Sequence, residues 1–257
     1  MQNLVNLEGK RGLVVGVANE HSIAAGCAHA FRDAGAELAL TYLNDVAKPY
    51  VIPVAEAVGA PMFLPCDVSK PGELEAVFET VEQTWGKLDF LLHSIAFAPR
   101  DDLHTSVVNT SAEGFAMAMD ISCHSFLRMA KLARPLMKDG GSLMTVSYFG
   151  AERVIEDYNL MGPVKAALEA SVRYAAADLA ADNIRTFSLS AGPIKTRAAS
   201  GIGHFDELID RVRERTPSHQ LVSIEQVGRI AAFLASEAAT PMSGSVIFAD
   251  NSFHVMG

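Results

Sequence analysis

The sequence predicts an α/β fold in which helices cover both faces of one seven-stranded parallel sheet. Short apolar or β-branched runs alternate with longer segments of helical period, which is typical of such a sheet. No linker, low-complexity tract or internal repeat interrupts this alternation. The chain has 257 residues, 49% of them hydrophobic, which suits one sizeable core. We therefore expect residues 1–257 to form a single doubly wound domain.

Seven short runs are the expected strands. They span residues 12–15, 37–42, 62–66, 89–93, 142–147, 185–190 and 245–249. Pro65 weakens the third, because proline cannot donate to a strand ladder and is confined mostly to the edges and ends of sheets. Glycines at 35, 59, 86, 140 and 141 lie where helices should stop and strands begin.

Six segments of helical period separate these strands, at about 22–34, 46–58, 72–85, 111–137, 158–181 and 224–237. Ser223 and Gln226 form a capping box for the last, and Ser69 with Pro71 supplies an N-cap and a first-turn proline for the third. Residues 193–217 depart from the alternation, since small residues and glycines precede a short amphipathic segment. We expect this region to be an insertion.

The composition excludes several classes of function. A formal net charge of -9 argues against binding to nucleic acid or to an anionic membrane. No apolar run approaches the ~18 residues of a membrane span, and the start of the chain does not resemble a secretory signal. Three widely spaced cysteines suit reduced, buried thiols rather than disulfides. We therefore expect a cytoplasmic protein.

The turn after the first strand is a candidate nucleotide site, because ligands of open α/β sheets bind beyond the carboxyl ends of the strands. Gly16 permits a tight turn and close approach of a pyrophosphate, and Ser22 can cap a helix whose N-terminal amides face that anion. The turn lacks the full G-x-G-x-x-G pattern. An ordinary strand-to-helix turn explains it equally well.

The next strand ends bear on the choice of cofactor. No Arg or Lys immediately follows Tyr42, which favours NADH over NADPH, although Lys48 and Arg32 lie near enough to reach a 2′-phosphate. Asp67 suits either the adenine amino group or an ordinary turn. Residues 94–99 are small and apolar enough for a nicotinamide ribose to lie against them.

Tyr158 and Lys165 lie seven residues apart at the expected start of a helix. Seven steps of about 100° are nearly two turns, so both side chains would point the same way, ~10 Å apart along the axis. The lysine can then bind ribose hydroxyls and favour the phenol as a proton donor. A surface tyrosine and a solvated lysine would show the same spacing. The histidines show no metal-ligand spacing, so we expect no metal site.

Together these motifs resemble the short-chain dehydrogenase/reductase superfamily. The resemblance rests on the glycine turn, the Tyr158/Lys165 pair and residues 66–68, 93–95 and 190–196. Ordinary members carry a tyrosine four residues before the lysine, where this chain has Met161. The stretch 147–165 is instead similar to the enoyl-acyl-carrier-protein reductases of bacteria. This implies a Rossmann-type domain with Tyr158 as the active-site phenol and Tyr148 as the second active-site tyrosine.

The resemblance also implies two sets of binding residues. The dinucleotide would contact Gly16, Ser22, Ile23, Leu43, Asp67, Val68, Ile95, Lys165, Ile194, Lys195, Thr196, Arg197 and Ala198. The acyl pocket would be lined by Ala96, Phe97, Ala98, Met161 and Phe205, five residues that core packing alone would also explain. Residues 193–217 would form a lid over the substrate.

The implied activity is NADH-dependent reduction of the trans-2 double bond of an enoyl thioester in fatty-acid synthesis. Hydride would add to the β-carbon, Tyr158 would donate a hydrogen bond to the enolate oxygen, and Lys165 would anchor the cofactor ribose; protonation at the α-carbon would complete the reduction. A carbonyl reductase would need a tyrosine at 161, and a silent dinucleotide-binding regulator would be expected to have lost Tyr158 or Lys165.

The family suggests a homotetramer. The alanines of residues 166–177 would allow close helix packing between subunits, although core packing within one subunit explains them as well. An acyl carrier protein is acidic, so its docking would require a local basic patch on this chain. The candidates are Lys195, Arg197, Arg211, Arg213 and Arg215, although solvated helix charges also explain the last three. A coenzyme A thioester is the alternative substrate.

Overall fold

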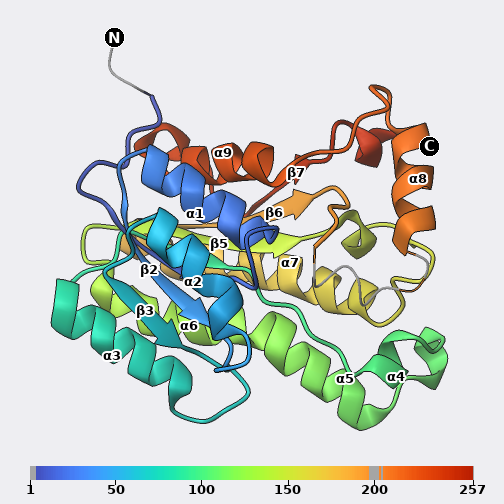
Figure 1. The fold of residues 1–257 in the computed structure, drawn as a ribbon, viewed down its shortest axis with the longest axis horizontal. Helices are drawn as coiled ribbons and strands as arrows, with labels where there is room; N and C mark the ends of the chain where they lie inside the picture. Colours follow the sequence, from blue (N-terminus) through green and yellow to red (C-terminus); the bar gives the residue numbers. More distant parts are fainter. Residues whose placement is uncertain (1–3, 197–202, 204, 257) are drawn as a thin grey trace.

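The computed structural model, which describes residues 4–196, 203 and 205–256, contains one seven-stranded sheet (Figure 1). Its order is β3-β2-β1-β4-β5-β6-β7, and every neighbouring pair is parallel. The strands are β1 Arg11–Val15, β2 Glu37–Tyr42, β3 Met62–Pro65, β4 Phe90–His93, β5 Gly141–Ser147, β6 Ile184–Ala191 and β7 Ser245–Ala249. The predicted sheet is confirmed, and Pro65 ends an edge strand.

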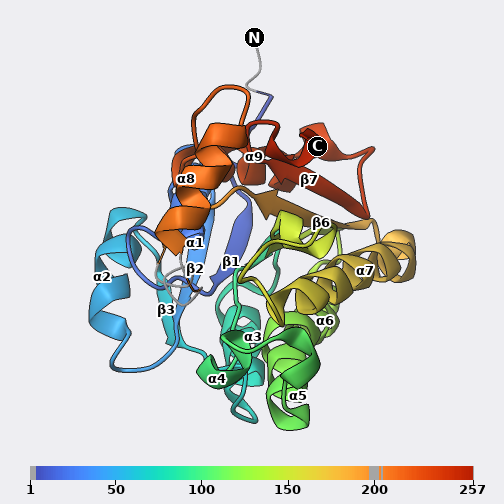
Figure 2. The same cartoon turned by 90° about the vertical axis from the view of Figure 1, so that its right-hand side faces the viewer.

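Helices cover both faces of the sheet, as expected. They are α1 Ile23–Asp33, α2 Lys48–Ala57, α3 Glu73–Trp85, α4 Arg100–Leu103, α5 Ala112–Met119, α6 Ser125–Ala133, α7 Met161–Leu179, α8 Phe205–Arg215 and α9 Ile224–Ala235. One buried cluster packs α1, α2 and α9 against the sheet, and a second packs α3, α6 and α7 against the other face. Figure 2 shows these two layers on opposite sides of the strands.

The predicted helix over 111–137 is interrupted. Between α5 and α6 the chain forms a π-helical turn, Asp120–His124, and α6 is followed by a 3₁₀ turn, Arg134–Leu136. Pro135 lacks the N–H that would continue the α-helical ladder. Further 3₁₀ turns are Val107–Asn109, Phe149–Ala151, Ala180–Asp182, Glu237–Ala239 and Phe253–Val255.

One predicted helix start and one predicted helix cap are wrong. The helix expected from Tyr158 begins only at Met161, because Asp157 and Asn159 adopt positive φ angles of 64° and 39° that an α-helix does not allow. Tyr158 therefore lies in the preceding turn, and its predicted placement on the helix of Lys165 does not hold. Likewise, Gly72 rather than Ser69 precedes α3.

The helices beside the carboxyl edge start where capping predicts. The Ser22 side chain accepts a hydrogen bond from the N–H of Ala25 at the start of α1, and Ser223 and Gln226 form the expected capping box of α9. Within the expected insertion, α8 stands at the end of the molecule toward which β5, β6 and β7 point (Figure 1). In the part of the chain that the structure describes, no helix is long and apolar enough to cross a membrane.

Candidate active site

A pocket of about 340 Å³ opens at the carboxyl edge of the sheet. Its walls come from the segment after β4, the ends of β5 and β6, the start of α7, and α8. It is lined by Ile23, Ala96, Phe97, Ala98, Leu103, Val146, Ser147, Tyr148, Tyr158, Met161, Lys165, Ala191, Gly192, Pro193, Ile194, Thr196 and Leu208. Most of these side chains are apolar, and the few polar ones include the tyrosines and the lysine that the sequence singled out.

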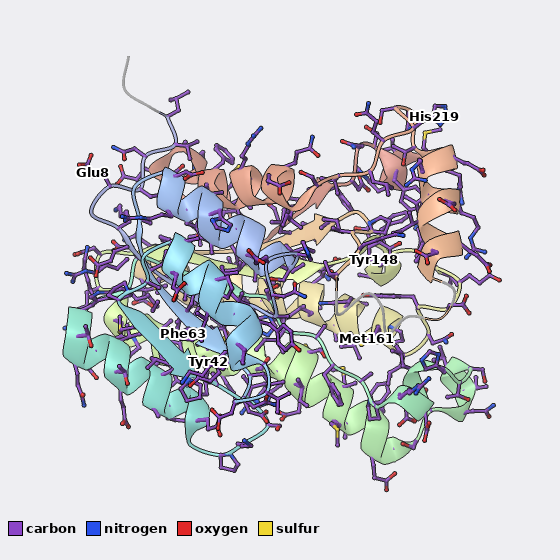
Figure 3. The ribbon with its side chains drawn as sticks, viewed as in Figure 1. Glu8, Tyr42, Phe63, Tyr148, Met161 and His219 are labelled. Atoms are coloured by element: carbon purple, nitrogen blue, oxygen red, sulfur yellow. The ribbon has the colours of Figure 1, made fainter. Side chains whose placement is uncertain are left out.

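The two tyrosines meet in this pocket. Tyr148 directly follows β5, and its ring centroid lies 5.0 Å from that of Tyr158, with the planes at 72°. Such an edge-to-face contact is favourable between aromatic rings. Figure 3 labels Tyr148 together with Met161, which opens α7 at the same end of the molecule. Burial raises the pKa of both phenols, so each remains a proton donor at neutral pH.

A glycine seats the ring of Tyr158. A Cβ atom at Gly150 would lie 2.4 Å from Cδ1 of Tyr158, so only glycine admits the ring there. On the other side of Tyr158, the Asn159 side-chain amide donates to the Leu103 carbonyl at 2.9 Å. These contacts hold Tyr158 although it lies outside the helix.

Lys165 is 5% exposed, and its Nζ donates to the Val146 carbonyl at 2.6 Å. Burial lowers the pKa of Lys165 to about 8, while the neighbouring Glu169 carboxylate opposes that shift. Glu169 lies one turn further along α7 and is itself buried, which raises its pKa. Its carboxylate accepts a hydrogen bond from the Ser147 hydroxyl at 2.6 Å. The sequence reasoning missed Ser147 and Glu169; a carboxylate one helical turn after the lysine was the available signal.

The buried His93 side chain links the elements that carry the pocket. Its ring is fully buried between the hydroxyls of Thr145, 2.7 Å from Nδ1, and Ser125, 2.8 Å from Nε2. Burial, with a contribution from the Lys165 charge, lowers the pKa of His93 to about 3, so the ring is neutral. It joins β4, β5 and α6 rather than exchanging protons.

The predicted cofactor residues fall into two groups. Ile23, Lys165, Ile194 and Thr196 line the pocket, whereas Gly16, Ser22, Leu43, Asp67, Val68, Ile95 and Lys195 do not. Most of the second group follow β1, β2, β3 and β4 along the same edge of the sheet. Arg197 and Ala198 lie outside the described residues, as does the side chain of Phe205, whose backbone begins α8.

Gly16 and Asp67 each have a local structural role at the end of a strand. Gly16 has a φ of 104°, and a Cβ atom there would meet the Ser94 carbonyl at 2.2 Å, so both backbone conformation and space require glycine. Asp67 accepts hydrogen bonds from the backbone and hydroxyl of Ser69, at 3.0 and 2.6 Å, which is the ordinary turn role.

The acyl-pocket prediction is matched in position by four residues. Ala96, Phe97, Ala98 and Met161 all line the pocket, together with Leu103 and Leu208, which the sequence reasoning missed. Among the residues described, no group of three or more His, Cys, Asp or Glu side chains is arranged to hold a metal ion.

Comparison with known proteins gives consistent matches over nearly the whole chain. Residues 16–254 match the model of a family described as Enoyl-(Acyl carrier protein) reductase. The chain is 47% identical to enoyl-[acyl-carrier-protein] reductase [NADH] 1 of Rhizobium meliloti, over 98% of this chain and 92% of the relative. It is 44% identical to enoyl-[acyl-carrier-protein] reductase [NADH] FabI of Nostoc, over 99% of this chain and 100% of that one.

Solved structures agree. The enoyl-[acyl-carrier-protein] reductase (NADH) of Aquifex aeolicus superposes with a TM-score of 0.95 at 42% identity, covering 99% of both chains. The reductase of Anaplasma phagocytophilum in complex with NAD superposes with a TM-score of 0.94, also at 42% identity, over 98% of this chain and 96% of the other.

Proposed function

Because this chain belongs to the enoyl-(acyl carrier protein) reductase family, we propose that it uses NADH to reduce the trans-2 double bond of enoyl thioesters in fatty-acid synthesis. The main structural support for this chemistry is that Tyr148, Tyr158 and Lys165 line one largely apolar pocket. Tyr158 reaches this position from a turn, and Met161 occupies the place where a carbonyl reductase of the superfamily would carry its tyrosine.

The residues at the carboxyl edge fit a dinucleotide. Gly16 lets the turn after β1 pack closely against the Ser94 carbonyl, and α1 begins beside that turn with Ser22 as its cap; helix N-termini of this kind bind anions. Ile23, Ile194 and Thr196, which line the pocket, would then border the nicotinamide end of the cofactor. The absence of a basic residue directly after β2 favours NADH. When bound, NADH supplies the hydride.

Tyr158 would donate a hydrogen bond to the thioester oxygen as negative charge develops on it. Burial raises the pKa of Tyr158, so its phenol is protonated at neutral pH and can donate this hydrogen bond. Tyr148 has a buried hydroxyl without a hydrogen-bond partner among the described residues, which leaves it available to the substrate. Lys165 would hold the ribose hydroxyls through its ammonium group.

The acyl chain would lie against the apolar wall formed by Ala96, Phe97, Ala98 and Met161, beneath residues 193–217 acting as a lid. Leu208 supports the lid proposal, since it places α8 against the pocket. The thioester would be carried by an acyl carrier protein. The candidate basic patch is partly neutralised, however, because Lys195, Arg211 and Arg213 each form an ion pair with Asp206, Glu156 and Asp210, respectively.

We further propose that residues 1–257 act as one catalytic domain in a cytoplasmic homotetramer. The three cysteines are free and buried, which suits a reducing compartment. A groove between α6 and α7, lined in part by Leu127, Ala130 and Ala170, would allow close helix packing between subunits.

The test is NADH consumption with a crotonyl thioester. We expect turnover by the wild-type chain and a loss of about 10²-fold in kcat for Tyr158→Phe, with the affinity for NADH retained. Tyr50→Phe is the matched control, because Tyr50 is 57% exposed on α2 and lies outside both the active-site pocket and the groove between α6 and α7. NADH consumption with an acetoacetyl thioester but not with the crotonyl one would identify a carbonyl reductase, and no turnover of either would contradict catalysis.

A further inference from the structure

The segment after β4 forms the pocket wall at Ala96, Phe97 and Ala98, and its backbone has left the sheet. The last sheet-like contact is the Ser94 N–H, which donates to the Val15 carbonyl at 2.8 Å. Backbone groups beyond this point need other partners, because unpaired polar groups destabilise a fold. The position of this wall therefore depends on contacts from outside the sheet.

Ser122 provides such a contact. Its hydroxyl accepts from the N–H of Phe97 at 2.8 Å and donates to the carbonyl of the same residue at 2.9 Å. Ser122 is fully buried, whereas Phe97 is 48% exposed at the pocket. A single side chain thus satisfies both backbone groups of one residue, as a neighbouring strand would.

The anchor belongs to the π-helical turn Asp120–His124, and the same part of the helix holds the start of the segment. The Ser125 hydroxyl donates to the Ile121 carbonyl at 2.6 Å and therefore accepts from Nε2 of His93. Both ends of residues 93–97 are consequently tied to one short stretch of helix. π-Helical turns of this kind are frequent at functional sites.

We propose that Ser122 is a positioning residue that sets the acyl-chain specificity of this enzyme by holding the Phe97 backbone at the pocket wall. The inference rests on the proposed function. The cofactor side of the segment stays anchored through His93 and Ser94 when Ser122 is changed. Loss of the Ser122 hydroxyl therefore loosens the acyl wall and leaves the nicotinamide side in place.

The test compares Ser122→Ala with Ser142→Ala by steady-state kinetics. Ser142 is also fully buried and donates to one backbone carbonyl, that of Leu234 at 3.0 Å, but it lies at the amino-terminal end of β5. We expect Ser122→Ala to raise KM about tenfold for an octenoyl thioester, less for a crotonyl thioester, and less than about twofold for NADH. Because the wall contacts ground state and transition state alike, kcat should change little.

A second readout does not depend on turnover. Amide hydrogen exchange should be faster at Phe97 in Ser122→Ala than in the wild type, and unchanged there in Ser142→Ala. The proposal is overturned if Phe97 stays equally protected in Ser122→Ala, if KM for the octenoyl thioester is unchanged, or if both variants raise it equally. If the wild type reduces neither thioester, the proposed function fails, and exchange at Phe97 still decides whether Ser122 anchors the wall.

Discussion

Gly150→Ala should inactivate the enzyme through Tyr158 without touching cofactor or substrate. The new Cβ atom would lie 2.4 Å from Cδ1 of Tyr158, whereas ordinary contact begins at 3.4 Å, so the ring must retreat by about 1 Å. The ring cannot easily move away, because it is 7% exposed and packs against Tyr148. A displacement of about 1 Å at a catalytic group costs roughly 10²-fold in rate, and overpacking costs about 1–3 kcal/mol of stability.

The assay is NADH oxidation with a crotonyl thioester, combined with thermal unfolding and fluorescence titration of NADH. We expect kcat to fall about 10²-fold with the NADH affinity nearly unchanged. Gly59→Ala is the matched control, since Gly59 has a φ of 61° but no atom within 4 Å of the added Cβ, so it should lose stability and keep its rate. A wild-type kcat in Gly150→Ala would refute the reasoning that Gly150 positions Tyr158.

Four further outcomes are expected. Gly16→Ala should weaken NADH binding at least tenfold in a fluorescence titration, because it strains the turn and collides with the β4 loop; unchanged affinity would place the pyrophosphate elsewhere. As the pH rises through about 8, the pKa of Lys165, its ammonium is lost and kcat/KM should fall. Glu169→Gln removes a charge that raises that pKa, so its profile should fall at lower pH; an identical profile would show that the two groups are not coupled. Burial raises the pKa of Cys27 and of Cys66 to about 12, so iodoacetamide at pH 8 should modify them only after unfolding, as read by mass spectrometry.

Much of the fold could be predicted because the information is local. All seven strands were predicted to within about one residue at their ends, since apolar runs and glycine punctuation mark them directly. The prediction was wrong where local conformation departs from periodicity. The helical period appears to begin at Tyr158, yet Asp157 and Asn159 adopt positive φ angles and turn the chain before α7. Nothing in the period of the sequence marks the π-helical turn at Asp120–His124 either.

The candidate site was predictable to a similar degree. Tyr148, Tyr158 and Lys165 were singled out by spacing and by family resemblance, and the pocket brings them together. The way in which Tyr158 is positioned differs from the prediction. Tyr158 lies in a turn and packs against Gly150, whereas the prediction placed it on the helix of Lys165. Resemblance identifies residues, but the contacts that orient them come from elsewhere in the chain.

The sequence by itself determined the order of the elements, the parallel sheet, the glycine after β1 and the residues of the tyrosine and lysine pair. These follow from neighbouring residues, whose periodicity and backbone preferences act over a few positions. Only the tertiary structure decided that Ser122 bonds Phe97 and that Glu169 bonds Ser147. These two contacts join groups 25 and 22 residues apart in the chain. Such distant polar groups come within hydrogen-bond distance only when the elements that carry them have packed together.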